Sequence, residues 1–276
     1  MERSRLDPGG VLALSLLLVA RTSRAIDAFE IQVYDGTANR PGVPGLELHV
    51  NYVADGTKVA EAPELPMNHV THLTLEPSVG ITDWWELGGY LLTALRGDGR
   101  FDYGGVKLRS KFVTPGSFHE HLRLGFNYEL SLQPSSYDAD RWGGEIRPIV
   151  AWEDDRWLFA GNPILDVPLA GKGLESGPTF EPAIEVLRKL GAFGSIGVEY
   201  YGAFGPMEGF YPLREQQHYI YQVFNLLAVE RLELNIGVGE GLTAASNRVV
   251  LKMIAGWSFE PASLKPVETQ RNGDRE

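Results

Sequence analysis

The sequence predicts an all-β protein whose fold is a twelve-stranded antiparallel transmembrane β-barrel. Three observations lead to this prediction. Apolar residues alternate with polar or small residues along twelve segments, turn-rich stretches separate these segments, and the connections alternate between short and long. A period of two residues is typical of strands that have one face in water and the other in an apolar medium. An even number of strands agrees with bacterial barrels.

The alternation is clearest in residues 122–132, where Leu124, Phe126 and Tyr128 share one face and Asn127 lies on the other. It is weaker in the ninth and tenth segments. The predicted strands are residues 46–52, 73–81, 85–95, 106–112, 122–132, 144–152, 157–169, 180–187, 195–204, 218–226, 232–239 and 249–259.

The connections between the predicted strands support a barrel over a soluble sandwich. They are short after even-numbered strands, at 82–84, 153–156 and 188–194. They tend to be longer after odd-numbered strands, at 53–72, 96–105, 133–143 and 205–217. Short periplasmic turns that alternate with longer outer loops are typical of outer-membrane barrels, whereas a sandwich has no reason to alternate in this way.

Composition excludes several functional classes. The formal net charge is −11, which argues against a nucleic-acid partner because such binding needs a basic surface. The absence of cysteine excludes disulfides, thiol nucleophiles and cysteine-ligated metals. We predict no cofactor. The predicted partners are outer-membrane lipid, the barrel-assembly machinery and a small-molecule solute of unknown identity.

The predicted domain organisation begins with a signal peptide in residues 1–25. Arg3 and Arg5 form a basic start, residues 11–20 are apolar or small, and Ser23 and Ala25 suit cleavage after Ala25. Residues 26–45 are an N-terminal extension or a plug, residues 46–259 form the barrel, and residues 260–276 are a polar periplasmic tail. The predicted location is the outer membrane of a Gram-negative bacterium.

Aromatic residues and prolines mark particular levels of the predicted barrel. Aromatic side chains on the apolar face, mostly beside the short turns, predict a girdle at one water–lipid boundary. The girdle residues are Trp85, Phe112, Trp152, Trp157 and Trp257. A closed barrel has no edge strand for residues without an N–H, so the strand prolines are expected at bulges. These prolines are Pro77, Pro148, Pro163, Pro168 and Pro182.

Charged side chains on the polar strand faces are predicted to line the lumen. A basic side chain facing lipid at the bilayer midplane of a barrel costs about 2–4 kcal/mol, so these residues must point inward. Two interpretations stay open: opposed walls of opposite sign that select solutes in a water-filled pore, or a paired network that closes the interior. The predicted lumen-lining residues are Lys107, Arg109, Lys111, Arg123, Arg147, Glu47, Glu76, Glu86, Glu129, Glu145, Glu181, Glu185, Glu199 and Glu233.

Enzymatic and metal chemistry find little support in the sequence. Outer-membrane phospholipases, whose twelve-stranded architecture is similar, use a His-x-Ser pair on a lipid-facing strand. None of the six histidines has a serine two residues later; His69 and His72 are each followed by threonine at that spacing. His119 and His121 lie in a predicted short turn, at the opposite end from His69 and His72, so the two pairs cannot share an ion. We predict no catalytic residues and no metal site.

Several runs resemble a family of outer-membrane β-barrels that carries the labels transporter and meta-pathway of phenol degradation. The runs are Glu86-Leu87-Gly88-Gly89-Tyr90, Val106-Lys107-Leu108-Arg109-Ser110-Lys111-Phe112, Trp142-Gly143-Gly144-Glu145-Ile146-Arg147-Pro148 and Gly237-Val238-Gly239-Glu240-Gly241-Leu242-Thr243, with further matches at 29–36, 47–52 and 162–164. The resemblance spans nearly all of residues 26–259 and implies an outer-membrane barrel. It supplies no site residues.

The sequence therefore predicts a porin-like barrel that allows passive passage of small polar or amphiphilic solutes. A non-conducting structural or adhesion barrel is the first alternative, and a lipid-modifying barrel enzyme is the second.

Overall fold

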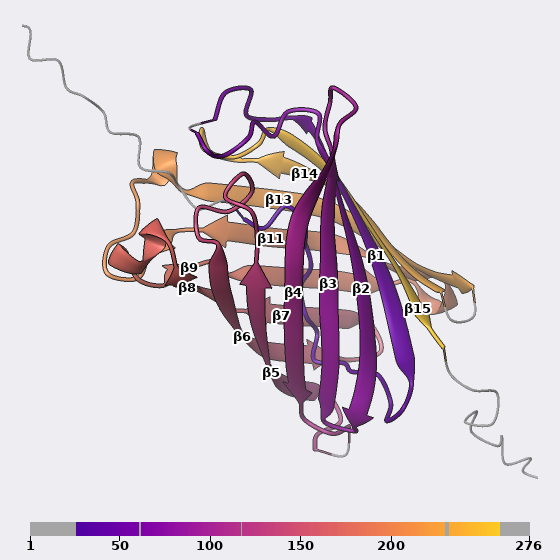
Figure 1. The fold of residues 1–276 in the computed structure, drawn as a ribbon. Helices are drawn as coiled ribbons and strands as arrows, with labels where there is room; N and C mark the ends of the chain where they lie inside the picture. The colour runs from indigo at the N-terminus through magenta and orange to yellow at the C-terminus, as the bar shows by residue number, and fades with distance from the viewer. Residues whose placement is uncertain (1–25, 61, 117, 230–231, 260–276) are drawn as a thin grey trace, which may run out of the picture.

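The computed structural model describes residues 26–259, except residues 61, 117, 230 and 231. The predicted signal peptide and the predicted tail lie outside the described residues. A single antiparallel sheet closes on itself through the pairing of the first and last strands, and forms the barrel seen in Figure 1. Within the described residues, no helix has the length and apolar character needed to cross a membrane.

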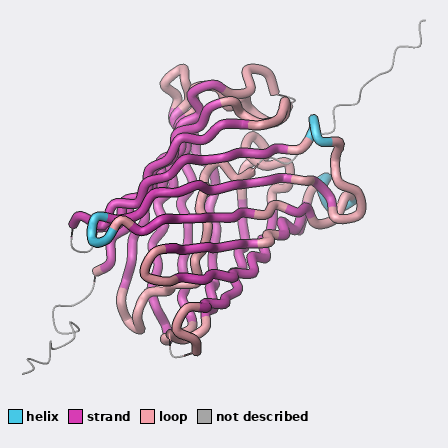
Figure 2. Tube along the Cα trace, turned by 180° about the vertical axis from the view of Figure 1, so that it is seen from behind, coloured by secondary structure: helices cyan, strands magenta, loops and turns pink. Residues whose placement is uncertain are grey.

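The sheet contains fifteen strand segments that form twelve barrel strands. Each of the pairs β7–β8, β9–β10 and β11–β12 is one barrel strand with a short interruption. The segments are β1 (Pro44–Asp55), β2 (Thr71–Thr82), β3 (Trp85–Leu95), β4 (Phe101–Val113), β5 (Leu122–Leu132), β6 (Trp142–Glu153), β7 (Trp157–Asn162), β8 (Leu165–Ala170), β9 (Thr179–Phe180), β10 (Ala183–Lys189), β11 (Gly194–Ala203), β12 (Gly205–Pro206), β13 (Gln217–Val229), β14 (Leu232–Gly241) and β15 (Val249–Ser258). Three short 3-10 helices, Lys172–Glu175, Gly191–Phe193 and Leu213–Glu215, lie at the strand ends (Figure 2).

The predicted fold class is confirmed, and each of the twelve predicted segments corresponds to one barrel strand. The lengths of the connections alternate only in part as predicted, because residues 96–100 form a short connection at the end with the longer loops and residues 114–121 form a longer one at the end with the short turns. Residues 83–84, 154–156 and 190–193 connect strands at one end, which we call the turn end. Residues 56–70, 133–141 and 207–216 connect strands at the opposite end, which we call the loop end.

The alternation of side chains separates an apolar outer surface from a polar interior. On β5, Phe126, Tyr128 and Leu130 are exposed on the outside, whereas Asn127 and Glu129 are buried inside. A soluble protein rarely exposes so continuous an apolar surface, but lipid requires one. The closed barrel and its apolar surface match a location in the bacterial outer membrane.

Outward-facing aromatic residues cluster at the turn end. Trp84, Trp85 and Phe112 stack with ring centroids 6.1–6.4 Å apart. Trp152 on β6 and Trp157 on β7 each have their ring centroid within 6.0 Å of the ring centroid of Phe159, which is also on β7. Trp257, at the end of β15, is also exposed on the outside. All five residues predicted for the girdle therefore lie at one end of the barrel, at least partly exposed.

The strand prolines behave differently from the prediction. Pro168 lies beside a shift in register between β6 and β8, as a bulge requires. Pro77 and Pro148 stand opposite Leu46 and Phe126 with no change of register. The register is also the same on both sides of Pro163. The prediction of bulges is therefore wrong for these three prolines, because a proline whose missing N–H faces a gap in the ladder needs no extra residue.

Candidate functional site

The N-terminal segment, residues 26–43, runs through the interior of the barrel, where its indigo trace can be followed in Figure 1. Near the loop end, the backbone N–H of Ile26 donates to Gln217 Oε1 at 3.4 Å. The side chains of Asn51 and Thr74 donate to the carbonyls of Ala28 and Phe29, each at 2.9 Å. These contacts hold the start of the segment against β1, β2 and β13.

At the centre of the interior, two cations of the wall bind carboxylates of the N-terminal segment. Lys107 Nζ lies 2.6 Å from Asp27 Oδ2, 3.0 Å from Glu30 Oε2 and 3.1 Å from Glu129 Oε2. Arg147 lies 3.3 Å from Glu30 and 2.6 Å from Glu145. Glu30 is thus a buried carboxylate that is shared by cations from β4 and β6.

Tyr34 fills the space beside these ion pairs. Its hydroxyl lies 2.7 Å from the hydroxyl of Tyr90 and donates to Glu30 Oε1 at 3.1 Å. The guanidinium of Arg147 lies 4.4 Å from the centre of the Tyr34 ring, where a cation–π attraction adds to the packing. The backbone of Tyr34 exchanges two hydrogen bonds, of 2.7 and 3.0 Å, with the side chain of Asn162.

A second cluster links strands β2, β3 and β4. Arg109 binds Glu76 at 2.6 Å and Glu86 at 2.7 Å, and Lys111 binds Glu86 at 2.9 Å. The backbone N–H of Asn39 also donates to Glu86, at 2.6 Å. The predicted basic residues on β4 are therefore balanced by carboxylates on the neighbouring strands β2 and β3 as well as by the N-terminal segment.

Two further groups of ion pairs lie at the turn end, around Arg123 on β5, and on the opposite side of the barrel, between β15 and β11. Arg123 binds Asp35 of the N-terminal segment at 2.9 Å and also pairs with Glu153. On the far wall, Lys252 pairs with Glu199 and donates to the carbonyl of Ile31 at 3.0 Å.

Most of the predicted lumen-lining residues are gathered in this interior network. Eight of them are buried: Lys107, Arg109, Arg147, Glu76, Glu86, Glu129, Glu185 and Glu199. Five are half-buried, namely Lys111, Arg123, Glu47, Glu145 and Glu181, and Glu233 is exposed. Each of the five predicted basic residues has an acidic partner within 4 Å.

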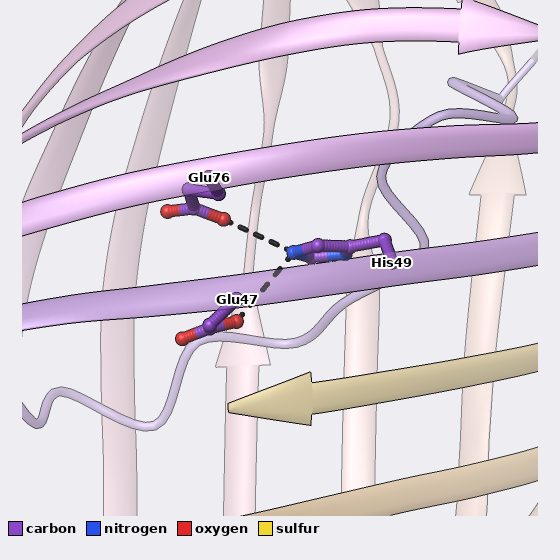
Figure 3. A group of neighbouring side chains, drawn as sticks. All are labelled: Glu47, His49 and Glu76. Carbon is purple, nitrogen blue, oxygen red and sulfur yellow. Dashed lines mark hydrogen bonds and ion pairs between the residues drawn. The ribbon is translucent and has the colours of Figure 1, made fainter. Parts of the chain in front are cut away.

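A histidine lies between two of the predicted carboxylates (Figure 3). His49 Nε2 is 3.1 Å from Glu76 Oε2 and 3.5 Å from Glu47 Oε2. The three ligand atoms lie within 4.8 Å of one another, so a neutral imidazole and two carboxylates could hold a divalent cation here. Gln32 donates to Glu47 and Arg109 binds Glu76, so protein cations and donors already satisfy part of this cluster.

Sequence reasoning missed three important interior residues: Glu30, His49 and Asn162. His49 could have been found, because it lies two residues after Glu47 and therefore on the same strand face. Glu30 lies before the first barrel strand, in a run where Phe29, Ile31 and Val33 alternate with Glu30 and Gln32, but this short alternation does not indicate which wall residues the run meets.

Two cavities lie along the N-terminal segment. One, of about 20 Å³, is lined by Ile31, Val53 and Val250 among others. The other, of about 30 Å³, is lined by Glu30, Arg147 and Ile164 among others. A single water molecule needs roughly 10–15 Å³, so each cavity holds only one or two water molecules.

The barrel is similar to solved outer-membrane channels. An outer membrane channel from Pseudomonas putida F1 superposes with a TM-score of 0.56 at 13% identity, over 83% of this chain and 100% of that one. The KdgM porin gives a TM-score of 0.53 at 10% identity, over 78% and 99% of the two chains. The NanC porin also gives 0.53 at 10% identity, over 78% and 100%.

No family model and no curated protein matches the chain. The label that refers to phenol degradation therefore receives no support. At these identities, the similarity to the three channels shows a shared fold, the closed barrel of outer-membrane proteins.

Proposed function

We propose that this protein is an outer-membrane channel for the passive passage of small polar or amphiphilic solutes, and that residues 26–43 form a resident plug. The observation that carries the proposal is the path of this segment along the lumen. Its carboxylates Asp27, Glu30 and Asp35 bind wall cations near the centre and at the turn end. Side chains can fill the interior of an eight-stranded barrel, and twelve strands enclose more space than that. The segment occupies the additional space.

The contacts of the plug explain why it stays in place and how it can leave. Removing one partner of a buried ion pair leaves an uncompensated charge, which costs about 3–5 kcal/mol. The plug is therefore held by its ion pairs as well as by apolar packing. When it moves, water and solute ions can solvate Lys107, Arg147 and Arg123 in its place.

Planar-bilayer recordings test this proposal. Deleting residues 27–38 removes most of the plug but keeps residues 39–43, which bind Ser78 and Gly80 on β2. We expect brief, rare openings from the full chain and a larger, long-lived conductance from the deletion variant. A size series of uncharged sugars, measured by liposome swelling, would then give the limiting radius. A correctly folded deletion variant that passes neither ions nor sugars would contradict the channel proposal.

The filled interior favours one alternative, a non-conducting structural barrel. The two cavities along the plug have volumes of only about 20 and 30 Å³. The same recordings separate the two functions, because a structural barrel predicts silence from the full chain under every voltage and salt gradient.

A further inference from the structure

Two carboxylates of the same charge stand directly opposite each other on the inner face of the wall. Glu47 on β1 pairs in register with Glu76 on β2. Like charges at directly opposite positions destabilise a sheet unless a cation lies between them. His49 lies two residues after Glu47, on the same face of β1, and its ring reaches both carboxylates, as Figure 3 shows.

One proton on His49 serves only one of these carboxylates well. The Nε2 atom is 3.1 Å from Glu76 Oε2 and 3.5 Å from Glu47 Oε2. An N–H bond points in one direction, and a hydrogen bond weakens steeply as it departs from a straight line. A divalent cation, by contrast, accepts a lone pair from all three atoms at once. The three atoms are therefore arranged as ligands of one ion.

The distances from His49 agree with a tetrahedral metal site. Zn²⁺ binds imidazole nitrogen and carboxylate oxygen at about 2.0–2.2 Å, which places neighbouring ligand atoms roughly 3.3–3.6 Å apart. The measured 3.1 and 3.5 Å are close to this spacing, and all three atoms lie within 4.8 Å of one another. The side chain of Glu47 is 34% exposed, so it has room to close on an ion and provides a path of entry.

Arg109 orients one of the ligands without competing for it. Its guanidinium lies 2.6 Å from Glu76 Oε1, whereas the other oxygen of this carboxylate, Oε2, faces His49. Partners outside the ligand shell commonly hold metal-binding carboxylates in this way. Glu76 can therefore bind an ion through Oε2 and keep its ion pair with Arg109.

The charge around Glu47 favours a divalent cation. Among the described residues, His49 is the only basic side chain within 4 Å of Glu47. Glu233 on β14 adds negative charge, because only Gly256 of β15 lies between it and Glu47 in the cross-strand row. The charges that act on Glu233 are those of Glu47 and Asp35, which are also acidic. This part of the interior thus attracts cations.

Gln32 of the plug supplies the fourth position. Its Nε2 atom donates to Glu47 Oε2 at 3.1 Å, and its Oε1 atom is buried with no hydrogen-bond partner in the part of the chain that the structure describes. A half turn of the amide exchanges these two atoms and brings the carbonyl oxygen, a metal ligand, beside Glu47. Gln32 also lines the larger cavity together with Glu30 and Glu145, so acceptors for the turned amide nitrogen lie beside it.

We propose that Glu47, His49 and Glu76 form a zinc site, and that the side-chain carbonyl of Gln32 completes it and fastens the plug to β1 and β2. The imidazole selects a transition metal over Ca²⁺ and Mg²⁺, which prefer oxygen ligands. The metal site stands without the channel function, whereas its regulatory role, a lock on the plug, rests on the proposed function.

Zinc titration of the purified protein tests the site. The full chain is extracted from outer membranes in detergent, stripped with a chelator and titrated with Zn²⁺ against a chromophoric competitor. We expect one Zn²⁺ per chain, and a large excess of Ca²⁺ or Mg²⁺ should not displace it. Co²⁺ at the same site should show the strong visible absorption of a four-coordinate ion. Absence of stoichiometric binding, or the weak absorption of six-coordinate Co²⁺, would overturn the proposal.

Variants assign the binding to these residues. His49→Gln should lower the zinc affinity at least about 100-fold, since losing a partner that only orients a ligand already costs 10–100-fold. Glu47→Gln, at the half-exposed ligand, should also weaken binding and serves if the His49 variant does not fold. Heat-dependent gel mobility monitors folding. His119→Gln is the matched control, because His119 and His121 form a second histidine pair in the connection between β4 and β5. Zinc binding that is lost in the His119 variant and kept in the His49 variant would place the ion in that connection and overturn the site.

Conductance of the same proteins tests the lock. Zn²⁺ should lower the open probability of the native chain, and a chelator should restore it. Gln32→Leu should keep most of the zinc affinity but lose this response, because the plug no longer reaches the ion. Openings that Zn²⁺ does not alter in a zinc-binding chain would overturn the lock. A chain that binds zinc through His49 and never conducts would contradict the channel function while supporting the zinc site.

Discussion

Lys107 on β4 places its Nζ atom 3.0 Å from Glu30 Oε2, although the two residues are 77 positions apart in the chain. This contact joins the wall of the barrel to the plug. Both side chains are buried, and Lys107 also binds Asp27 and Glu129. The ion pairs that close the lumen are therefore the ones that a change of conformation must break.

Neutralising Glu30 should loosen the plug. Glu30→Gln keeps the volume of the side chain but removes the charge that Lys107 and Arg147 share. Loss of one charge from a buried pair costs about 3–5 kcal/mol, because the remaining charges are left uncompensated. When the plug leaves, water solvates those charges, so the substitution favours the undocked state. We expect the open probability in planar bilayers to rise at least tenfold. Asp98→Asn, at an exposed pair with Arg100, should leave it unchanged. Identical recordings from the Glu30 variant and the native chain would show that this carboxylate does not hold the plug.

Removing Arg109 should destabilise the barrel itself. Arg109→Gln leaves Glu76 and Glu86 without their shared guanidinium, in a buried site. We expect the free energy of unfolding to fall by about 3–5 kcal/mol. Urea titration, followed by the shift in gel mobility between folded and unfolded barrels, measures it. Arg100→Gln provides the comparison, because its pair with Asp98 is exposed and screened by solvent and should contribute little to stability. An equal decrease in the free energy of unfolding in both variants would mean that burial does not strengthen the ion pairs of Arg109.

Thiol labelling on whole cells should establish which end of the barrel faces outward. The longer connections predict that the loop end is extracellular. Asp98 lies in the connection between β3 and β4, and Asp83 lies in the two-residue turn between β2 and β3. Because the native chain has no cysteine, Asp98→Cys should react with an impermeant thiol reagent and Asp83→Cys should not. The opposite pattern would invert the topology.

Sequencing of the protein from outer membranes should find Ile26 at the N-terminus. Cleavage after Ala25 would release the chain at the first residue of the plug, where Ile26 contacts Gln217 near the loop end. A mature chain that retains residues 11–20 would refute the predicted signal peptide. The plug would then begin as a continuous extension of that apolar stretch.

Local sequence determined the barrel and the two faces of its wall. The alternation of Phe126, Tyr128 and Leu130 with Asn127 and Glu129 is enough to predict a strand, its outward side and its inward side, because successive side chains point to opposite faces. The same reasoning placed Lys107 and Arg109 inside, since neither can face lipid. These properties depend on neighbours in the chain and can be predicted without the fold.

Only the tertiary structure decided what the inward-facing charges do. The partners of Lys107 and Arg147 include Asp27 and Glu30, which lie before the first barrel strand and reach the wall only after the barrel encloses them. The alignment of Glu47 with Glu76 likewise depends on the register between two strands, which closure of the whole sheet fixes. Local periodicity sets which face a residue occupies, whereas its partner across the lumen depends on contacts between distant parts of the chain.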